Sequence, residues 1–207
     1  MGGLFGKVID FQNLLEASRK ARIGKRFKRD VLAFEFGLER ELLKLQDELA
    51  TGSYVHGPYR RFTIHDGKSR EISAAPYRDR VLHHALCSVL EPVLEPAFYF
   101  HSYACRKGKG THKALLVASR YARDSRYVLK CDIVKFYPSV DHGVLKGMLA
   151  RKIRDRDVLR LCGLIIDSWR ASGPVLYFPG DDLFTPLGRA RGLPIGNLTS
   201  QFFANLY

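Results

Sequence analysis

The stretch Tyr127-Val128-Leu129-Lys130-Cys131-Asp132 decides how this sequence is organised. Its aromatic, β-branched and aliphatic residues predict a strand that ends in one carboxylate, Asp132. A strand end is rigid, and a carboxylate held there is suited to binding a divalent metal ion. Taken without its neighbours, Asp132 is better explained as an ordinary turn or helix cap, so the flanking segments decide between the two interpretations. Asp141 follows Pro138-Ser139 and opens a helical pattern, which is typical of a cap.

The flanking segments are mostly helical. Apolar spacing and turn residues predict helices over 11–22, 34–49, 77–90, 111–123 and 197–207, two helices within 141–171, a strand or loop over 173–178 and a glycine-punctuated loop over 188–196. Pro92 is expected to break the helix that precedes it. Residues 62–72 alternate around Asp66-Gly67, which predicts a β-hairpin with Lys68 and Arg70 near its tip.

The composition limits the classes of protein to which this sequence can belong. Among 207 residues, 34 are Lys or Arg and 21 are Asp or Glu, so the net charge is +13. This charge predicts an anionic partner, either nucleic acid or an acidic membrane surface, and the hydrophobic share of 46% excludes wholesale disorder. No uncharged apolar run approaches the roughly 18 residues of a membrane span, and the first residues do not resemble a signal peptide. Four scattered cysteines favour a reducing compartment, and we expect a cytoplasmic protein.

Two segments concentrate the basic residues. Seven of the eleven residues 19–29 are Lys or Arg; they form either a solvated helix face and loop, which is slightly favoured, or a contact to a phosphate backbone. The segment 106–111, Arg-Lys-Gly-Lys-Gly-Thr, is not a phosphate-binding P-loop, because Gly110 separates Lys109 from Thr111. The scattered histidines do not form a metal-binding motif.

Four segments occur in a set order: 70–80 (REISAAPYRDR), 102–112 (SYACRKGKGTH), 130–142 (KCDIVKFYPSVDH) and 192–201 (GLPIGNLTSQ). Together they resemble the reverse transcriptases over residues 38–207, most closely those of diversity-generating retroelements, with group II intron and retron enzymes as the nearest relatives. The resemblance implies an α+β fold, the fingers and part of the palm of a polymerase right hand, with an antiparallel palm sheet backed by helices. The implied divisions are a basic helical segment (1–52), fingers (53–126) and a partial palm with a fingers insertion (127–207).

The resemblance also implies roles for single residues. Asp132 is the implied catalytic carboxylate and, with the backbone carbonyl of Ile133, a ligand of Mg²⁺, with Mn²⁺ as the alternative metal. Tyr137 is implied to exclude a ribose 2′-hydroxyl, although a tyrosine here also fits a core position. The implied nucleotide-binding residues are Lys68, Arg70, Ile133, Val134, Tyr137, Ile195 and Gly196. The implied template- or primer-binding residues are Arg78, Arg106, Lys107, Lys109, Pro194, Asn197 and Gln201.

The implied activity is RNA-directed DNA polymerisation, in which a primer 3′-hydroxyl attacks the α-phosphorus of a dNTP and pyrophosphate leaves. RNA template, DNA or RNA primer and dNTP are the implied partners, the retroelement type adds a basic accessory protein, and no membrane partner is expected. Many reverse transcriptases have Gln where this chain has Ile195. We hypothesise that the alkyl side chain makes copying error-prone, chiefly at template adenines.

The family's Tyr-x-Asp-Asp segment, which carries the other metal-binding carboxylates, does not occur in this sequence. We therefore expect a portion truncated before the second carboxylate motif and inactive by itself. The apolar stripe of Leu198, Phe202 and Leu206, which has no helix-ending signal, agrees with this expectation. Two alternatives stay open: a non-catalytic nucleic-acid-binding remnant, and a group II intron or retron type of reverse transcriptase.

Overall fold

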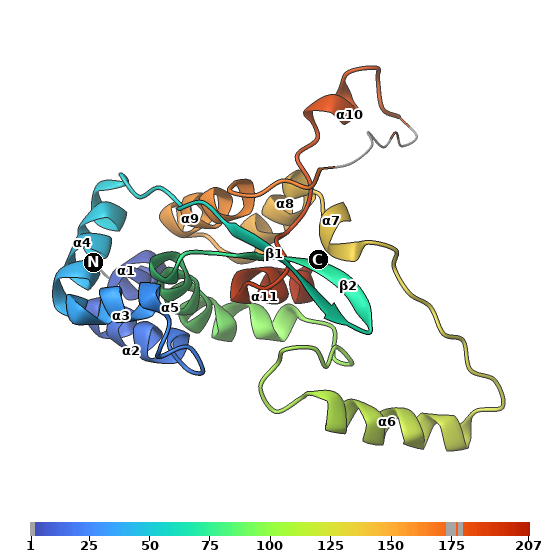
Figure 1. Cartoon of the computed structure of the whole chain (residues 1–207). Coiled ribbons are helices and arrows are strands. Elements are labelled where there is room, and N and C mark those ends of the chain that lie inside the picture. The colour runs from blue at the N-terminus through green and yellow to red at the C-terminus, as the bar shows by residue number, and fades with distance from the viewer. Residues whose placement is uncertain (1–2, 173–176, 178–179) are drawn as a thin grey trace.

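Helices make up most of the fold, as the apolar spacing predicts (Figure 1). The computed structural model describes residues 3–172, 177 and 180–207. Its elements are α1 (Leu4–Ile9), α2 (Phe11–Ala21), α3 (Arg29–Phe36), α4 (Leu38–Thr51), β1 (Arg60–Asp66), β2 (Lys68–Ala74), α5 (Tyr77–Leu94), the 3-10 helix η1 (Glu95–Ala97), α6 (Thr111–Asp124), α7 (Phe136–Ser139), α8 (His142–Lys152), α9 (Arg156–Asp167), α10 (Thr185–Gly188) and α11 (Leu198–Leu206). None of the described helices combines the length and apolar character that crossing a bilayer requires.

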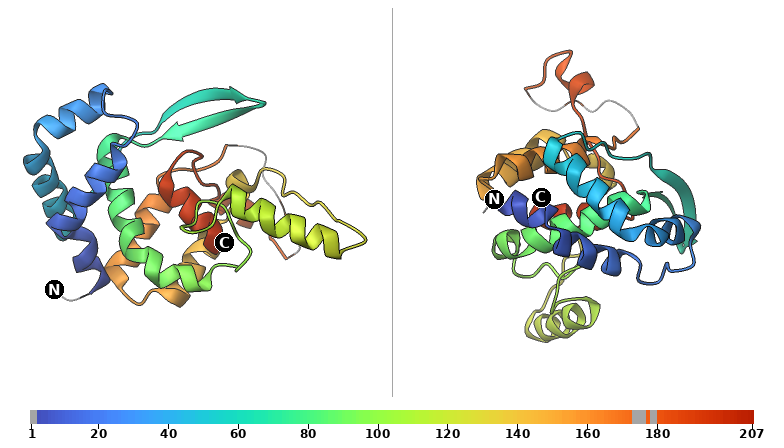
Figure 2. Two further views of the ribbon diagram at one scale, coloured as in Figure 1. Left: turned by 90° about the horizontal axis from the view of Figure 1, so that it is seen from below. Right: turned by 90° about the vertical axis from the view of Figure 1, so that its left-hand side faces the viewer.

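The helix α5 is the centre of the core. It packs against α1, α2 and α3 and against α11, and Figure 2 shows it running between the N-terminal helices and α11. The predicted break at Pro92 is wrong, because α5 continues to Leu94. A proline inside a helix costs about 3 kcal/mol. Burying Leu90 and Leu94 completely, each worth about 1.5–3 kcal/mol, offsets that cost.

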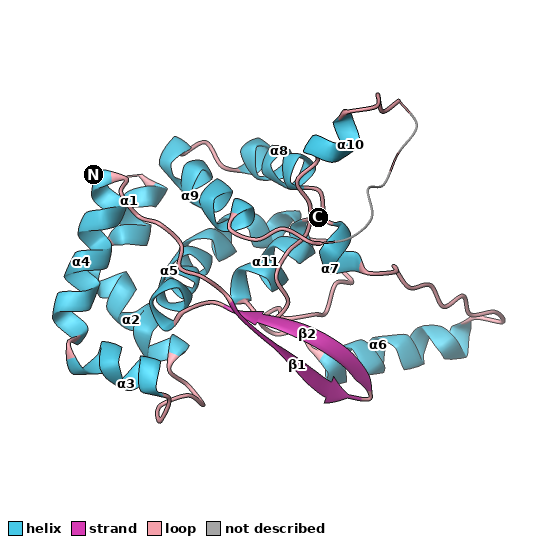
Figure 3. Ribbon diagram, turned by 45° about the horizontal axis from the view of Figure 1, so that its top comes forward, coloured by secondary structure: helices cyan, strands magenta, loops and turns pink. Residues whose placement is uncertain are grey.

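The predicted hairpin is confirmed. β1 and β2 pair antiparallel, with Phe62 opposite Ile72 and Ile64 opposite Arg70, and Gly67 forms the tip with φ +66°. Figure 3 shows this hairpin, in magenta, extending away from the helical body. It is the one sheet among the described residues, so the predicted helical-and-strand composition is confirmed in its coarse form.

The predicted strand over residues 127–132 is not formed. These residues have no regular secondary structure, and Tyr127, Val128 and Leu129 are 84%, 79% and 88% exposed. A strand satisfies its N–H and C=O groups only through a neighbouring strand, and none of the described residues provides one. The antiparallel palm sheet is therefore absent from the described part of the chain. Of the predicted strand or loop over 173–178, all but Tyr177 lies outside the described residues.

Candidate nucleic-acid interface

A cavity of about 670 Å³ opens at the base of the hairpin. Five basic side chains line it, against the single carboxylate of Asp30: Lys25, Lys28, Arg29, Arg60 and Arg80. They come from the loop between α2 and α3, from the first residue of α3, from the start of β1 and from α5. The folded chain thus brings the basic cluster of 19–29 to the hairpin, which supports the phosphate-contact interpretation of that cluster.

The positive groups around this cavity repel one another. Burial lowers the pKa of Lys25, the charges of Arg80 and Lys28 lower it further, and Asp30 only partly opposes them. Burial also lowers the pKa of Arg80. An anion in the cavity would relieve this repulsion, because it would supply the charge that the lining lacks.

Arg80 is held in place by the protein. Its Nη2 donates a hydrogen bond to the carbonyl oxygen of Ala21 at 2.8 Å, and its guanidinium lies 5.6 Å from the ring centre of Tyr77. The other basic residues of the cavity, apart from half-buried Lys25, are exposed. Arg80 is therefore fixed in the cavity wall, whereas Lys28 and Arg29 are exposed and the guanidinium of Arg60 lies 5.5 Å from the ring centre of Phe62.

The loop 194–197 is bonded to the base of the hairpin. Ser73 N donates to the carbonyl oxygen of Ile195 at 2.9 Å, and Asn197 Nδ2 donates to the carbonyl oxygen of Ser73 at 2.7 Å. Ala75 N donates to Asn197 Oδ1 at 3.2 Å. Asn197 is 2% exposed, and both of its amide atoms are hydrogen-bonded within the protein, where they position the loop. Its template or primer contact stays a prediction.

Gly196 reaches the surface of this loop with φ +108° and lines the basic cavity. A Cβ at this position would lie 2.7 Å from Ile72 Cγ2, so the hairpin leaves no room for a side chain. Pro194 is buried and Ile195 is half-buried. Of the three predicted ligand contacts in Pro194-Ile195-Gly196, only Gly196 is placed on the cavity.

The predicted phosphate-contacting residues of the hairpin, Lys68 and Arg70, are exposed near its tip. Arg78 lies apart from them, because it is paired with Glu48 and its guanidinium lies 5.5 Å from the ring centre of Tyr54. The structure thus assigns Arg78 to packing of α5 against α4. Lys68 and Arg70 add positive charge near the hairpin tip, outside the cavity lining.

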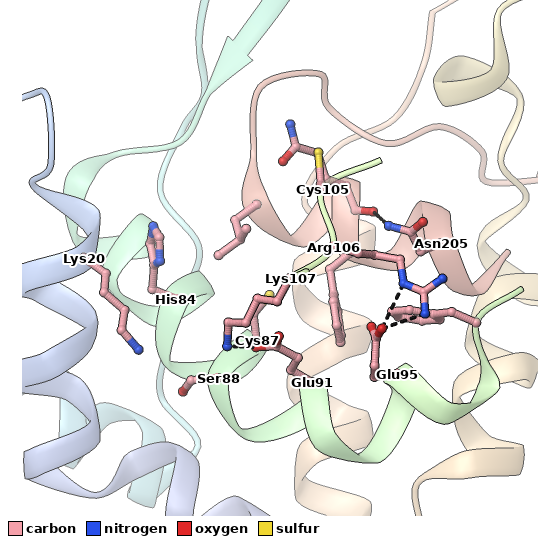
Figure 4. Close-up of a pocket in the computed structure, with 14 residues that line it drawn as sticks. Lys20, His84, Cys87, Ser88, Glu91, Glu95, Cys105, Arg106, Lys107 and Asn205 are labelled. Atoms are coloured by element: carbon pink, nitrogen blue, oxygen red, sulfur yellow. Dashed lines mark hydrogen bonds and ion pairs between the residues drawn. The ribbon is translucent and has the colours of Figure 1, made fainter. Parts of the chain in front are cut away.

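Arg106, Lys107 and Lys109 are predicted to track the template, and the structure shows Arg106 paired with Glu95 within the protein. The Arg106 side chain is 6% exposed, and its guanidinium lies 2.6 Å from Glu95 Oε1 (Figure 4). Lys107 Nζ lies 2.6 Å from Glu91 Oε2, and Lys109 Nζ lies 4.1 Å from the ring centre of Phe100. These contacts hold the segment beside a second cavity of about 350 Å³, which Gln201 also lines.

The predicted catalytic residues Asp132, Ile133, Val134 and Tyr137 differ in their surroundings. Asp132 is exposed, as are Ile133 and Val134, at 66% and 82%. Tyr137 is half-buried, and its carbonyl oxygen accepts the N–H of Leu193 at 2.9 Å. The structure thus brings Tyr137 to this loop, whereas it leaves Asp132 without a fixed neighbour.

The residues present do not fit a two-metal site. No three His, Cys, Asp or Glu side chains gather to hold a metal ion within the described ranges. One exposed carboxylate cannot supply the several oxygen ligands that Mg²⁺ requires. Asp141, by contrast, is confirmed as a helix cap, because its Oδ1 accepts the N–H of Val144 at 2.9 Å.

Sequence reasoning missed Arg60 and did not connect the cluster 19–29 to the hairpin. The signal was present, since Arg60-Arg61 opens the strand and the cluster holds seven basic residues in eleven. What the sequence does not contain is the packing of α3 and α5 that places both at one cavity.

Known proteins resemble this chain over most of its length, although no family model matches it. Protein YkfC of Escherichia coli K12 is 30% identical over 173 residues, which are 80% of this chain and 43% of that protein. The group II intron-encoded protein LtrA of Lactococcus lactis subsp. cremoris is 26% identical over 172 residues, 82% of this chain and 27% of that protein. The nuclear intron maturase 2 of Arabidopsis thaliana mitochondria is 27% identical over 128 residues, 56% of this chain and 17% of that protein.

Among solved structures, a chain of a partial Cas6-RT-Cas1–Cas2 complex matches all of this chain and 34% of its own length. The TM-score is 0.52 at 20% sequence identity, which shows a shared fold. The chain thus spans less than half the length of each of these relatives.

Proposed function

We propose that this chain, a relative of the group II intron-encoded reverse transcriptases and maturases, forms the N-terminal, RNA-binding portion of an RNA-directed DNA polymerase. The observation that carries the proposal is the cavity at the hairpin base, with five basic side chains against one carboxylate. Such a site suits the phosphate backbone of an RNA template.

Recognition would divide between the cavity and the hairpin. Arg29 and Arg60 present planar guanidinium groups, which pair with two phosphate oxygens at once. Lys68 and Arg70, near the hairpin tip, would take the triphosphate of a dNTP. The exposed backbone at Gly196 and the nearby Tyr137 would then lie between template and nucleotide, next to the primer.

We include the polymerase step in the proposal, although the described residues do not complete a site for it. A primer 3′-hydroxyl would attack the α-phosphorus of the dNTP, with pyrophosphate as the leaving group. We retain Mg²⁺, or Mn²⁺, as the metal because Asp132 and the Ile133 carbonyl are hard oxygen donors. Since these two donors do not complete a site, residues 1–207 alone are expected to have no DNA synthesis activity. Mg²⁺-dependent synthesis by this chain would contradict that expectation.

Two subtypes are consistent with the proposal. Ile195 favours a diversity-generating retroelement, in which error-prone copying and a basic accessory protein are expected. The intron-encoded relatives favour the group II intron type as the second candidate. Replacing Ile195 with Gln in an active, longer version should lower misincorporation at template adenines, measured by sequencing the cDNA. An unchanged adenine error rate would remove the argument for the retroelement type.

A non-catalytic nucleic-acid-binding protein would use the same cavity. Primer extension by the longer version separates it from a polymerase, because binding alone yields no extended product. Four free cysteines agree with a reducing compartment, and we propose the cytoplasm.

RNA binding by the cavity is tested by fluorescence anisotropy with a single-stranded RNA oligonucleotide over a salt series. The double variant Arg29→Ala/Arg60→Ala should bind roughly tenfold more weakly, with a salt slope lower by about 1.4, because each lost phosphate contact contributes about 0.7. Lys44→Ala is the matched control, since Lys44 is exposed on α4 and outside the cavity lining. Equal losses in both proteins would show that general charge, not the cavity, determines binding.

A further inference from the structure

His142 opens α8 and is buried, with 2% of its surface exposed. Its Nδ1 lies 3.1 Å from Asp167 Oδ1, and its Nε2 lies 2.7 Å from the carbonyl oxygen of Gly192. Both distances are hydrogen-bond distances, and both partners are oxygens that only accept. Each ring nitrogen therefore faces an acceptor.

A neutral imidazole cannot satisfy this arrangement. It carries one N–H, so one of its nitrogens would point a lone pair at an oxygen lone pair. An imidazolium donates from both nitrogens and also supplies the charge that pairs with Asp167. The geometry is satisfied in full only when the ring carries both protons.

Asp167 is held as a carboxylate in this arrangement. Its Oδ2 lies 2.5 Å from Lys146 Nζ. Burial raises the pKa of Asp167, but its hydrogen bonds to Lys146 and His142 lower it by more, so that the net shift is downward. Asp167 therefore accepts from His142 and does not donate to it.

Asp141, the carboxylate next to His142 in the chain, has partners of its own. Arg189 Nε lies 3.6 Å from Asp141 Oδ2, and Arg189 also pairs with Asp181. Arg191 faces Asp141 across a backbone bridge. The Tyr207 hydroxyl accepts the N–H of Asp141 at 3.3 Å. Asp167 is thus the carboxylate that contacts the His142 ring.

His142 contacts the start of the loop that reaches the hairpin. The segment 190–193 is bonded to the segment 137–142 by three backbone hydrogen bonds, from His142 to Ala190, from Gly192 to Val140 and from Leu193 to Tyr137. Three residues after Gly192, the carbonyl of Ile195 accepts the N–H of Ser73 in β2. A continuous series of contacts thus leads from Asp167 through His142 and Gly192 to the hairpin.

We propose that His142 is a positioning residue that carries two ring protons at neutral pH and, as an imidazolium held between Asp167 and Gly192, fixes the loop 194–197 against the hairpin. The consequence of this arrangement for RNA binding rests on the proposed function, whereas the protonation of His142 does not. Loss of one ring proton removes one of the two ring bonds and weakens the attachment of the segment 190–193, which its backbone hydrogen bonds still hold.

The first test is the protonation state of the unaltered chain. Long-range ¹H–¹⁵N NMR spectra of the ¹⁵N-labelled protein at neutral pH should show both ring nitrogens of His142 protonated. His112, which is exposed on α6, serves as the internal reference. A single neutral tautomer at His142 would overturn the proposal.

The second test removes the carboxylate partner. Asp167→Asn should leave His142 with one ring proton and speed amide hydrogen exchange at Gly192 and Leu193 about tenfold, because the segment loses the support of a charged hydrogen bond. Asp157→Asn is the matched control, because Asp157 is on the same helix and exposed, with its side chain 60% accessible. Unchanged protection in Asp167→Asn, or an equal loss in the control, would contradict the proposal.

RNA binding separates this inference from the proposed function. If the unaltered chain binds no RNA, the proposed function fails and the NMR result still decides the state of His142. If the chain binds RNA, Asp167→Asn should weaken that binding at neutral pH, and Asp157→Asn should not. If the chain binds RNA while His142 is a single neutral tautomer, the proposed function is retained and the positioning role of His142 is refuted.

Discussion

The helical body and the arm of residues 111–135 obey the same local patterns but have different surroundings. In the body, α5 carries ten buried residues along its length. In the arm, α6 carries none, and the apolar residues of the following segment are exposed (Figure 1). An apolar pattern in the sequence therefore predicts where a helix forms, and does not predict whether that helix is buried.

The arm also separates the two kinds of secondary structure. α6 forms although it packs on nothing extensive, because a helix closes its hydrogen bonds within itself. The strand predicted over 127–132 does not form, because its hydrogen bonds need a second segment. A predicted helix can therefore form without tertiary contacts, whereas a predicted strand cannot.

The largest expected difference between body and arm is in core packing. Leu86→Ala in α5 should lower the free energy of unfolding by about 2–5 kcal/mol, since Leu86 is completely buried. Leu116→Ala in α6 should change it by less than about 0.5 kcal/mol, since Leu116 is 73% exposed. Urea denaturation measures both, and a comparable loss at Leu116 would mean that the arm is covered in solution.

A pair of glycines sharpens the comparison. Gly192 and Gly110 both have positive φ, +103° and +105°, so alanine strains the backbone by about 1–3 kcal/mol at either position. At Gly192 a Cβ would also lie 2.5 Å from the Trp169 ring, which adds about 1–3 kcal/mol, whereas at Gly110 it meets nothing within 4 Å. Thermal unfolding should show Gly192→Ala as the less stable variant, and the reverse order would refute the packing at Trp169.

Lowering the pH should destabilise the helical body and leave the arm of residues 111–135 unaffected. Burial, with the positive charge of nearby His56 when protonated, lowers the pKa of His83 to about 3. The unfolded chain takes up this proton near pH 6.5, so stability falls as the pH drops from about 6.5 towards 3. Between pH 7 and 5 the loss is on the order of 2 kcal/mol.

Denaturation at both pH values measures this loss. His83→Leu should remove the His83 share of the dependence and leave the share of His84, whose pKa burial also lowers, to about 4. His112→Leu on α6 should leave both shares intact. Equal pH dependence in the His83 variant and the unaltered chain would show that another group is responsible.

Much of the fold was predictable. Helical spacing located α2, α4, α5, α6 and α11, and Asp66-Gly67 located the hairpin turn. Two helix boundaries were not predictable from the sequence, because tertiary packing sets them. α5 passes through Pro92 to bury Leu94, and the single stripe over 34–49 is divided at Gly37 into α3 and α4.

The candidate site was predictable in its residue types and not in its grouping. The sequence by itself determined the elements, the positive charge and the local caps such as Asp141, since these depend on neighbours within a few residues. Only the tertiary structure decided that Lys25, Arg60 and Arg80 share a cavity while Arg106 is taken by Glu95. It also decided that His142 lies between Asp167 and Gly192. The reason is physical: charge acts through space and burial, and both are set by contacts between residues distant in the chain.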